Sequence, residues 1–366
     1  MRGLLLVALV SGCIPTALRR EGARPLPAHA VDWNPQKVDV GRVQALAETG
    51  DELVLFGDKG AFVLVAGALV ATDPSVKSWR AAGTLPAPDG NGTWIVGVDG
   101  QGLLHHVRAR TKLEPISARF GLEQTPLFGL ARVDERRHAF LLGGGFAVAD
   151  GGKLTRFEAP LRGIAAGSGT LAELLDGGLR VTRVSGDRSY TLPGARGIGV
   201  DSLGATWVAD ERAVYREAEP GSLKLAYVAA RVDAFATAGP AVWLSDAGAL
   251  MRLGDGAAPA DTGAQVPPSA KLVGADNGDV WVLDATLTRL SVAIPSVTWP
   301  SGVHARVCSK CHDKGGAAGV DLGNEAAWQG KRALIRQRVI EKGDMPPKST
   351  PLAAEDRAAI EAWTRP

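Results

Sequence analysis

The chain has 366 residues, enough for two domains and for a well-buried hydrophobic core. Apolar residues make up 45% and charged residues 22%, and 46 glycines with 22 prolines stay below the collagen and low-complexity range, so a fibrous or largely disordered protein is excluded. With 41 basic against 39 acidic residues, the net charge of +2 offers no broad cationic face, and nucleic acid is not expected as a partner.

The amino terminus has the order of an export signal. Arg2 precedes the apolar run 4–10, and the small residues Ser11 and Gly12 follow it. The run is too short to span a bilayer as a mature helix. Residues 1–12 are therefore predicted to be a signal peptide.

Residues 10–13, Val-Ser-Gly-Cys, resemble a bacterial lipobox. The resemblance implies cleavage before Cys13, lipidation of its thiol and a membrane anchor facing the periplasm. Ile14 follows in place of the Asp that marks inner-membrane retention, which favours the outer membrane. The alternative is an ordinary signal peptide with an incidental cysteine. Residues 13–30 include Arg19 and Arg20 and have no apolar periodicity, so they are predicted to be a solvated tether.

A repeat occupies residues 31–295. Four short apolar runs share a central tryptophan, and the steps from Trp94 to Trp207, Trp243 and Trp281 are 113, 36 and 38 residues. The first step equals three periods of about 38 residues. Weaker units at 52–56, 138–142 and 170–174 bring the number to seven. Four short strands fit into each such period, as in the blade of a propeller.

The repeat array resembles a seven-bladed β-propeller with blades of the NHL or two-component-regulator type. Six or eight blades remain alternatives, because the units near 140 and 171 are weakly marked. The recurring tryptophans are predicted to fill the core between blades. Asp-Gly pairs at 89, 99, 150, 176 and 255 are predicted to form hairpin turns.

Few polar residues of the repeat suggest chemistry. Asp210, Asp246 and Asp284 each follow a tryptophan by three residues, where they would end a strand in a turn or, alternatively, bind calcium. His105 and His106 are adjacent, and alternation places them on opposite faces of a strand. No catalytic residue is assigned, and the propeller is expected to be a docking platform.

The strongest motif lies near the carboxy terminus, where residues 308–312 read Cys-Ser-Lys-Cys-His. In the C-x-x-C-H order, Cys308 and Cys311 add to the haem vinyl groups and His312 reaches the iron. Zinc, the main competitor, needs three or four protein ligands, and no second Cys pair or His-x-His cluster lies in this segment. Met345, in a Met-Pro-Pro turn, is the natural second ligand, because Met251 lies in a strand-like repeat.

Residues 298–366 resemble the small class I cytochrome c domain. The resemblance implies one covalent haem c, attached through Cys308 and Cys311, with His312 and Met345 as axial ligands of its iron. We therefore expect an all-α cytochrome c domain over residues 296–366. Two apolar helix faces agree with it, one with Trp328, Ile335 and Val339 and one with Leu352, Ala359, Ile360 and Trp363. His304 and Asp313 depart from the usual residues of such domains, and His304 is expected to pack or face solvent.

These features predict a membrane-anchored, extracytoplasmic monohaem c-type cytochrome that transfers single electrons. Filled axial positions leave the iron no vacant site for substrate chemistry. Residues 296–366 carry 11 basic and 8 acidic side chains. Lys310, Lys314 and Lys348 either belong to an ordinary solvated surface or, alternatively, form a basic docking rim that attracts an acidic redox protein. One alternative is a propeller dehydrogenase that oxidises a sugar or alcohol and passes electrons to the fused cytochrome. Another is a haem-containing binding or sensing protein.

Overall fold

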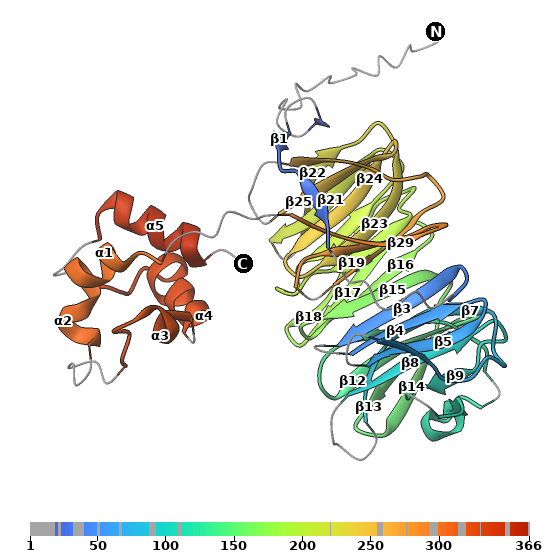
Figure 1. The fold of residues 1–366 in the computed structure, drawn as a ribbon. Coiled ribbons are helices and arrows are strands. Elements are labelled where there is room, and N and C mark those ends of the chain that lie inside the picture. The colour runs from blue at the N-terminus through green and yellow to red at the C-terminus, as the bar shows by residue number, and fades with distance from the viewer. Residues whose placement is uncertain are drawn as a thin grey trace, which may run out of the picture. The chain divides into compact units, whose positions relative to one another are not determined.

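The computed structural model divides the chain into two compact units, Met1–Ala293 and Ile294–Pro366 (Figure 1). It describes residues 19–20, 23–31, 40–49, 52–65, 68–87, 93–108, 111–123, 125–219, 221–254, 259–275, 277–292, 299–313, 320–329, 331–347 and 352–364. The predicted signal peptide, including Cys13, lies outside these residues.

The first unit is a seven-bladed β-propeller, which confirms the predicted architecture and blade number. Its first three blades are antiparallel sheets of four strands each. They hold β3 (Val43–Thr49), β4 (Glu52–Gly57), β5 (Gly60–Val65) and β6 (Ala68–Ala71); β7 (Trp79–Pro86), β8 (Thr93–Asp99), β9 (Leu104–His106) and β10 (Glu114–Pro115); and β11 (Leu127–Arg132), β12 (Arg137–Leu142), β13 (Gly145–Asp150) and β14 (Lys153–Glu158).

Blades four to six follow the same plan. They hold β15 (Leu161–Gly167), β16 (Thr170–Leu175), β17 (Gly178–Arg183) and β18 (Gly186–Thr191); β19 (Gly197–Val200), β20 (Thr206–Ala209), β21 (Ala213–Glu219) and β22 (Ser222–Val228); and β23 (Val232–Ala238), β24 (Ala241–Asp246), β25 (Ala249–Leu253) and β26 (Ala260–Gln265). A short 3-10 helix, η3 (Ser117–Phe120), separates the second and third blades.

The seventh blade is completed by the amino-terminal segment. β27 (Lys271–Gly274), β28 (Val280–Leu283) and β29 (Leu287–Val292) take β2 (Ala28–Ala30) as their fourth strand, and β1 (Arg24–Pro25) adds in parallel to β26 of the sixth blade. Residues 24–30 thus differ from the solvated tether predicted for 13–30. β1 and β2 pair with propeller strands because the open edge of a sheet needs a partner to close the ring. The local sequence of residues 24–30 gives no sign of these distant partners.

All seven sequence units fall on the second strand of their blades, which are β4, β8, β12, β16, β20, β24 and β28. The first strands of successive blades pack against one another around the centre of the ring. Trp207, Trp243 and Trp281 are at most 1% exposed, and their indoles lie in successive core clusters. Trp94 differs, because it is half-buried.

The indole nitrogens of Trp243 and Trp281 join neighbouring blades, whereas that of Trp207 bonds to Asp201 of its own blade. Trp243 Nε1 donates to the Gly278 carbonyl of the next blade at 3.0 Å. Trp281 Nε1 donates to Glu48 of the first blade at 3.0 Å, and Arg289 binds the same carboxylate at 3.2 Å. The predicted inter-blade core is therefore confirmed, and it also holds the ring closed.

Hairpin turns follow the Asp-Gly prediction wherever the structure describes them. The pairs at 99, 150 and 176 each connect two strands of one blade. Gly151 and Gly152 have φ values of 55° and 89°, and the two central residues of a type I′ hairpin turn need such positive values. The pairs at 89 and 255 lie outside the described residues.

The second unit is helical in its described part. Its elements are α1 (Ser301–Val303), η4 (His304–Cys308), α2 (Ser309–His312), α3 (Glu325–Gln329), α4 (Arg332–Ile335), η5 (Arg336–Glu341) and α5 (Ala354–Thr364). Both predicted apolar helix faces meet in its core, which is built around Trp328, Ile335, Ile360 and Trp363.

Candidate functional site

The first unbroken helical segment of the second unit carries the C-x-x-C-H motif. α1, η4 and α2 follow one another without a gap from Ser301 to His312, and the chain becomes extended at Asp313, with φ −79° and ψ 166°. Residues three apart in a helix share a face, so the thiols of Cys308 and Cys311 are neighbours on this segment. Cys308 is half-buried, Cys311 is exposed, and both are free thiols.

His312 is held by the segment that follows the helix. Its Nδ1 lies 3.0 Å from the Val320 carbonyl oxygen, and the Leu322 amide donates to the His312 carbonyl at 2.6 Å. A carbonyl only accepts, so Nδ1 carries the proton and the lone pair is left on Nε2. A hydrogen bond from Nδ1 to a backbone carbonyl is typical of a histidine that ligates a metal through Nε2.

The Cys308 thiol is the protected member of the pair. Burial raises its pKa to about 11, and the negative charge of Asp356 adds to the effect. Asp356, on α5, is buried and forms an ion pair with Arg306, which lies on the same helical segment as Cys308. The free Cys308 side chain is therefore a neutral thiol at neutral pH.

Met345 lies on a different element, the loop after η5. The amides of Asp344 and Met345 both donate to the Arg338 carbonyl, at 3.0 and 3.2 Å, and Arg338 Nε donates to Asp344 at 2.7 Å. These bonds fix the loop to the end of the helix, and the Met345 side chain is half-buried. The structure thus brings Cys308, Cys311 and His312 together on one segment and places Met345 on another of the same unit.

The two residues that depart from the usual cytochrome pattern contact each other. His304 Nε2 lies 3.0 Å from Asp313 Oδ1, across the length of the Cys-His segment. His304 is 8% exposed and packs beside the rings of Trp299 and Trp328, at centroid distances of 5.8 and 6.2 Å. Sequence analysis did not predict this contact, because nothing in the spacing pairs residues nine apart.

A tryptophan cluster was also missed as part of the site. Trp299, Trp328 and Trp363 form successive edge contacts at 6.1 and 5.5 Å. The indole nitrogens of Trp299 and Trp328 are buried, and neither has a hydrogen-bond partner among the described residues. Such orphaned donors are costly, so each needs an acceptor that the described residues do not supply. The sequence did offer a sign of this cluster, because three tryptophans occur within the last 68 residues.

The polar residues of the propeller take structural roles. Asp210 accepts the amides of Arg212 and Ala213 at 2.7 Å and thereby closes a turn, as the turn hypothesis predicted. Asp246 is 3% exposed and accepts the Tyr227 hydroxyl and two amides. In the described part of the chain, no group of three or more His, Cys, Asp or Glu side chains could hold a metal ion.

The two adjacent histidines point to opposite faces of β9, as predicted. His105 Nε2 lies 2.8 Å from Asp99 Oδ2. His106 instead stacks on Trp94, with ring centroids 4.0 Å apart and planes within 9°. They therefore do not form a shared metal site.

Solved structures with the same fold are numerous. A streptogramin B lyase covers 72% of this chain and 98% of its own length at 14% identity, with a TM-score of 0.53. The virginiamycin B lyase of Staphylococcus aureus covers 73% and 99% at 15% identity, with a TM-score of 0.53. The extracellular domain of BT3049 from B. thetaiotaomicron, assigned to a hybrid two-component system, covers 76% and 42% at 15% identity, with a TM-score of 0.55.

At these identities the likeness shows the propeller fold alone. No protein-family model matches the sequence, and neither does any curated protein. None of the helices in the described part of the chain has the length and apolar character needed to cross a membrane.

Proposed function

We propose that the protein is a monohaem c-type cytochrome of the bacterial cell envelope that transfers single electrons, with its propeller as a docking platform. Haem c would be held covalently by Cys308 and Cys311, with His312 and Met345 as axial ligands. The observation that carries the proposal is the C-x-x-C-H motif on one helical segment, with His312 Nδ1 bonded to the Val320 carbonyl.

The residues present fit this group. Both thiols are free, and the histidine tautomer leaves Nε2 available to iron. The buried indole nitrogens of Trp299 and Trp328 lack acceptors in the described part of the chain, and carboxylates of a bound group would satisfy them. The core around them is apolar and aromatic, which suits a large flat ligand.

Bound haem supplies a one-electron iron couple, and histidine with methionine ligation raises its potential. The chain's own contribution is to hold the two ligands rigidly. Val320 fixes the rotation of the His312 ring, and the Arg338 carbonyl fixes the backbone of Met345. Two protein ligands leave no open position on the iron, so the site favours electron transfer over substrate chemistry.

The partner and the location follow from charge and from the amino terminus. Lys310 is exposed within the motif, while Lys314 and Lys348 lie outside the described residues. A basic surface here would attract an acidic redox protein, and transfer rates would fall as salt rises. Lipidation of Cys13 would anchor the protein facing the periplasm, on the outer membrane as Ile14 favours.

The test is the absorption spectrum of the full, exported protein, oxidised and reduced. We expect a c-type spectrum with the weak red band of methionine ligation. Met345→Ala should abolish that band and lower the potential, while the exposed control Lys342→Ala should change neither. An unchanged spectrum in Met345→Ala would overturn the axial assignment. Reduction of the haem by a sugar or alcohol without added enzyme would instead favour a propeller dehydrogenase.

A further inference from the structure

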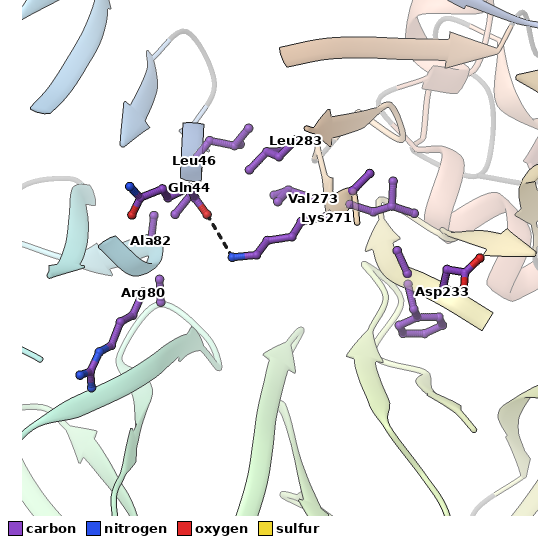
Figure 2. A pocket seen from close by; sticks show the side chains of 14 residues that line it. Gln44, Leu46, Arg80, Ala82, Asp233, Lys271, Val273 and Leu283 are labelled. Carbon is purple, nitrogen blue, oxygen red and sulfur yellow. Dashed lines mark hydrogen bonds between the residues drawn. The ribbon is translucent and has the colours of Figure 1, made fainter. Parts of the chain in front are cut away.

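One end of the propeller's central channel contains a cavity of about 410 Å³. Figure 2 shows its walls, which are the first strands of four blades, β3, β7, β23 and β27. The volume lies within the usual range of small-molecule sites. The cavity belongs to the first unit alone, so it is independent of the proposed haem site.

A recurring irregularity shapes this end of the channel. In five of the seven blades, the first strand carries one extra residue near its start, which has no partner on the second strand. The extra residues are Gln44, Arg80, Phe128, Arg162 and Asp233. A bulge turns its side chain out of the regular alternation, and bulges are frequent beside functional sites. Here they present a set of large side chains around one end of the ring.

The charge inside the cavity is positive. Arg80 and Lys271 both line it, and neither has a carboxylate partner among the described residues. Lys271 Nζ reaches the Gln44 carbonyl at 3.5 Å, and Figure 2 shows the Arg80 side chain directed away from Lys271. The Arg80 guanidinium lies 4.7 Å from the centre of the Phe128 ring. The one carboxylate in the lining, Asp233, is already paired with Arg231.

Apart from Gln44, the remaining side chains of the lining are apolar. It includes Leu46, Ala82, Val273, Phe235 and Leu283. Two cations over an apolar wall match a molecule with a negative head and an apolar body. The arginine fork suits a carboxylate in particular, because its two parallel N–H groups match the two oxygens.

We propose that this end of the channel binds a small organic carboxylate, with its apolar body against β3 and β27. Its anionic group would be bound by Lys271 and by Arg80, whose side chain would turn from Phe128 toward the ligand. Two further arginines are already paired with carboxylates. Arg162, at the bulge of β15, lies 3.9 Å from Asp176, and Arg196, just before β19, lies 3.0 Å from Glu211. They are therefore not part of the anion site, and Arg162 provides a matched control on the same ring.

The experiment uses isothermal calorimetry on the full-length, haem-loaded protein. The probes are 2-naphthoate and glutarate, and the neutral 2-naphthamide tests the role of charge. We expect 2-naphthoate to bind and 2-naphthamide to bind at least tenfold more weakly. Arg80→Gln and Lys271→Gln should each weaken 2-naphthoate by about tenfold, as the loss of a charge-assisted contact does. Arg162→Gln should change the affinity less than twofold.

Three results would overturn the proposal. They are no binding of either carboxylate, equal binding of the naphthoate and the amide, and an unchanged affinity in the Arg80→Gln, Lys271→Gln double variant. Both side chains are exposed, so the variants should fold, and circular dichroism checks this. The haem spectrum is a separate readout, so a failure here does not bear on the proposed electron transfer.

Discussion

The propeller and the carboxy-terminal unit encode their structures in opposite ways. The propeller repeats a weak signal seven times, so each unit can lose its tryptophan and the period is still visible. The carboxy-terminal unit contains one distinctive motif, the five consecutive residues from Cys308 to His312. Repetition identifies a fold but assigns no chemistry, whereas a single motif assigns chemistry and says little about packing.

The largest contrast should appear when the motif itself is broken. In a Cys308→Ser, Cys311→Ser double variant we expect complete loss of covalent haem, because no thiol remains to bond it. The propeller should keep its far-ultraviolet β signal. Mass spectrometry and a pyridine haemochrome assay measure the loss, and Ser309→Ala is the control within the same motif. Haem retained covalently by the double variant would disprove the attachment sites.

Within the propeller, the repeated position can be tested blade against blade. Trp243→Ala should lower the free energy of unfolding by about 3–5 kcal/mol, because it empties a fully buried site and removes the Gly278 bond. Trp94→Ala, at the half-buried equivalent, should cost clearly less. Chemical denaturation measures both. Equal losses would show that the repeat does not distinguish core from surface.

Acid should weaken the propeller through a buried histidine. His138 is 5% exposed, and burial lowers its pKa to about 4 from an ordinary value near 6.5. The unfolded chain therefore takes up the proton first, so stability is full above pH 6.5 and falls as the pH drops towards 4. A shift of this size corresponds to about 3 kcal/mol.

His138→Gln should remove that share of the pH dependence between pH 6.5 and 4, and denaturation at each pH measures it. The exposed His29→Gln variant is the control. Some slope should persist in His138→Gln, because burial also lowers the pKa of His106 to about 4. A slope identical to that of the wild type would exclude His138 as the cause.

The smallest expected difference separates two aspartates at one position of the repeat. Asp246→Ala should cost about 2 kcal/mol, because the buried Tyr227 hydroxyl and two amides lose their acceptor. Asp210→Ala should cost about 1 kcal/mol, since its turn is exposed to water that can replace the carboxylate. Thermal or chemical unfolding of the pair gives the comparison, and a larger loss at Asp210 would contradict it.

The sequence was sufficient for what recurs, while the haem assignment drawn from the C-x-x-C-H motif stays a prediction. It located the second strand of every blade, the tryptophan core and the turn at Asp150. It did not locate β1 and β2, because strands of two and three residues have no period and their partners lie more than 230 positions away.

Other features were also beyond a single sequence. The contact between His304 and Asp313 depends on where the chain runs after the helix ends. The channel bulges leave only a faint trace, an apolar residue, the bulged residue and then a small one, as in Leu161-Arg162-Gly163. Such a pattern gains meaning only once the strands are known to converge on a channel.

The closing strand has a mechanical consequence. β2 runs antiparallel to β29, and Ala28 lies opposite Val292, so the chain enters and leaves this pair at the same end. A pulling force between the two ends of the propeller would therefore peel the strands apart one hydrogen bond at a time, because antiparallel bonds lie across the strands. Tension should therefore open the ring at this one pair of strands, although β1, which precedes β2 in the chain, is also paired with β26 of the neighbouring blade.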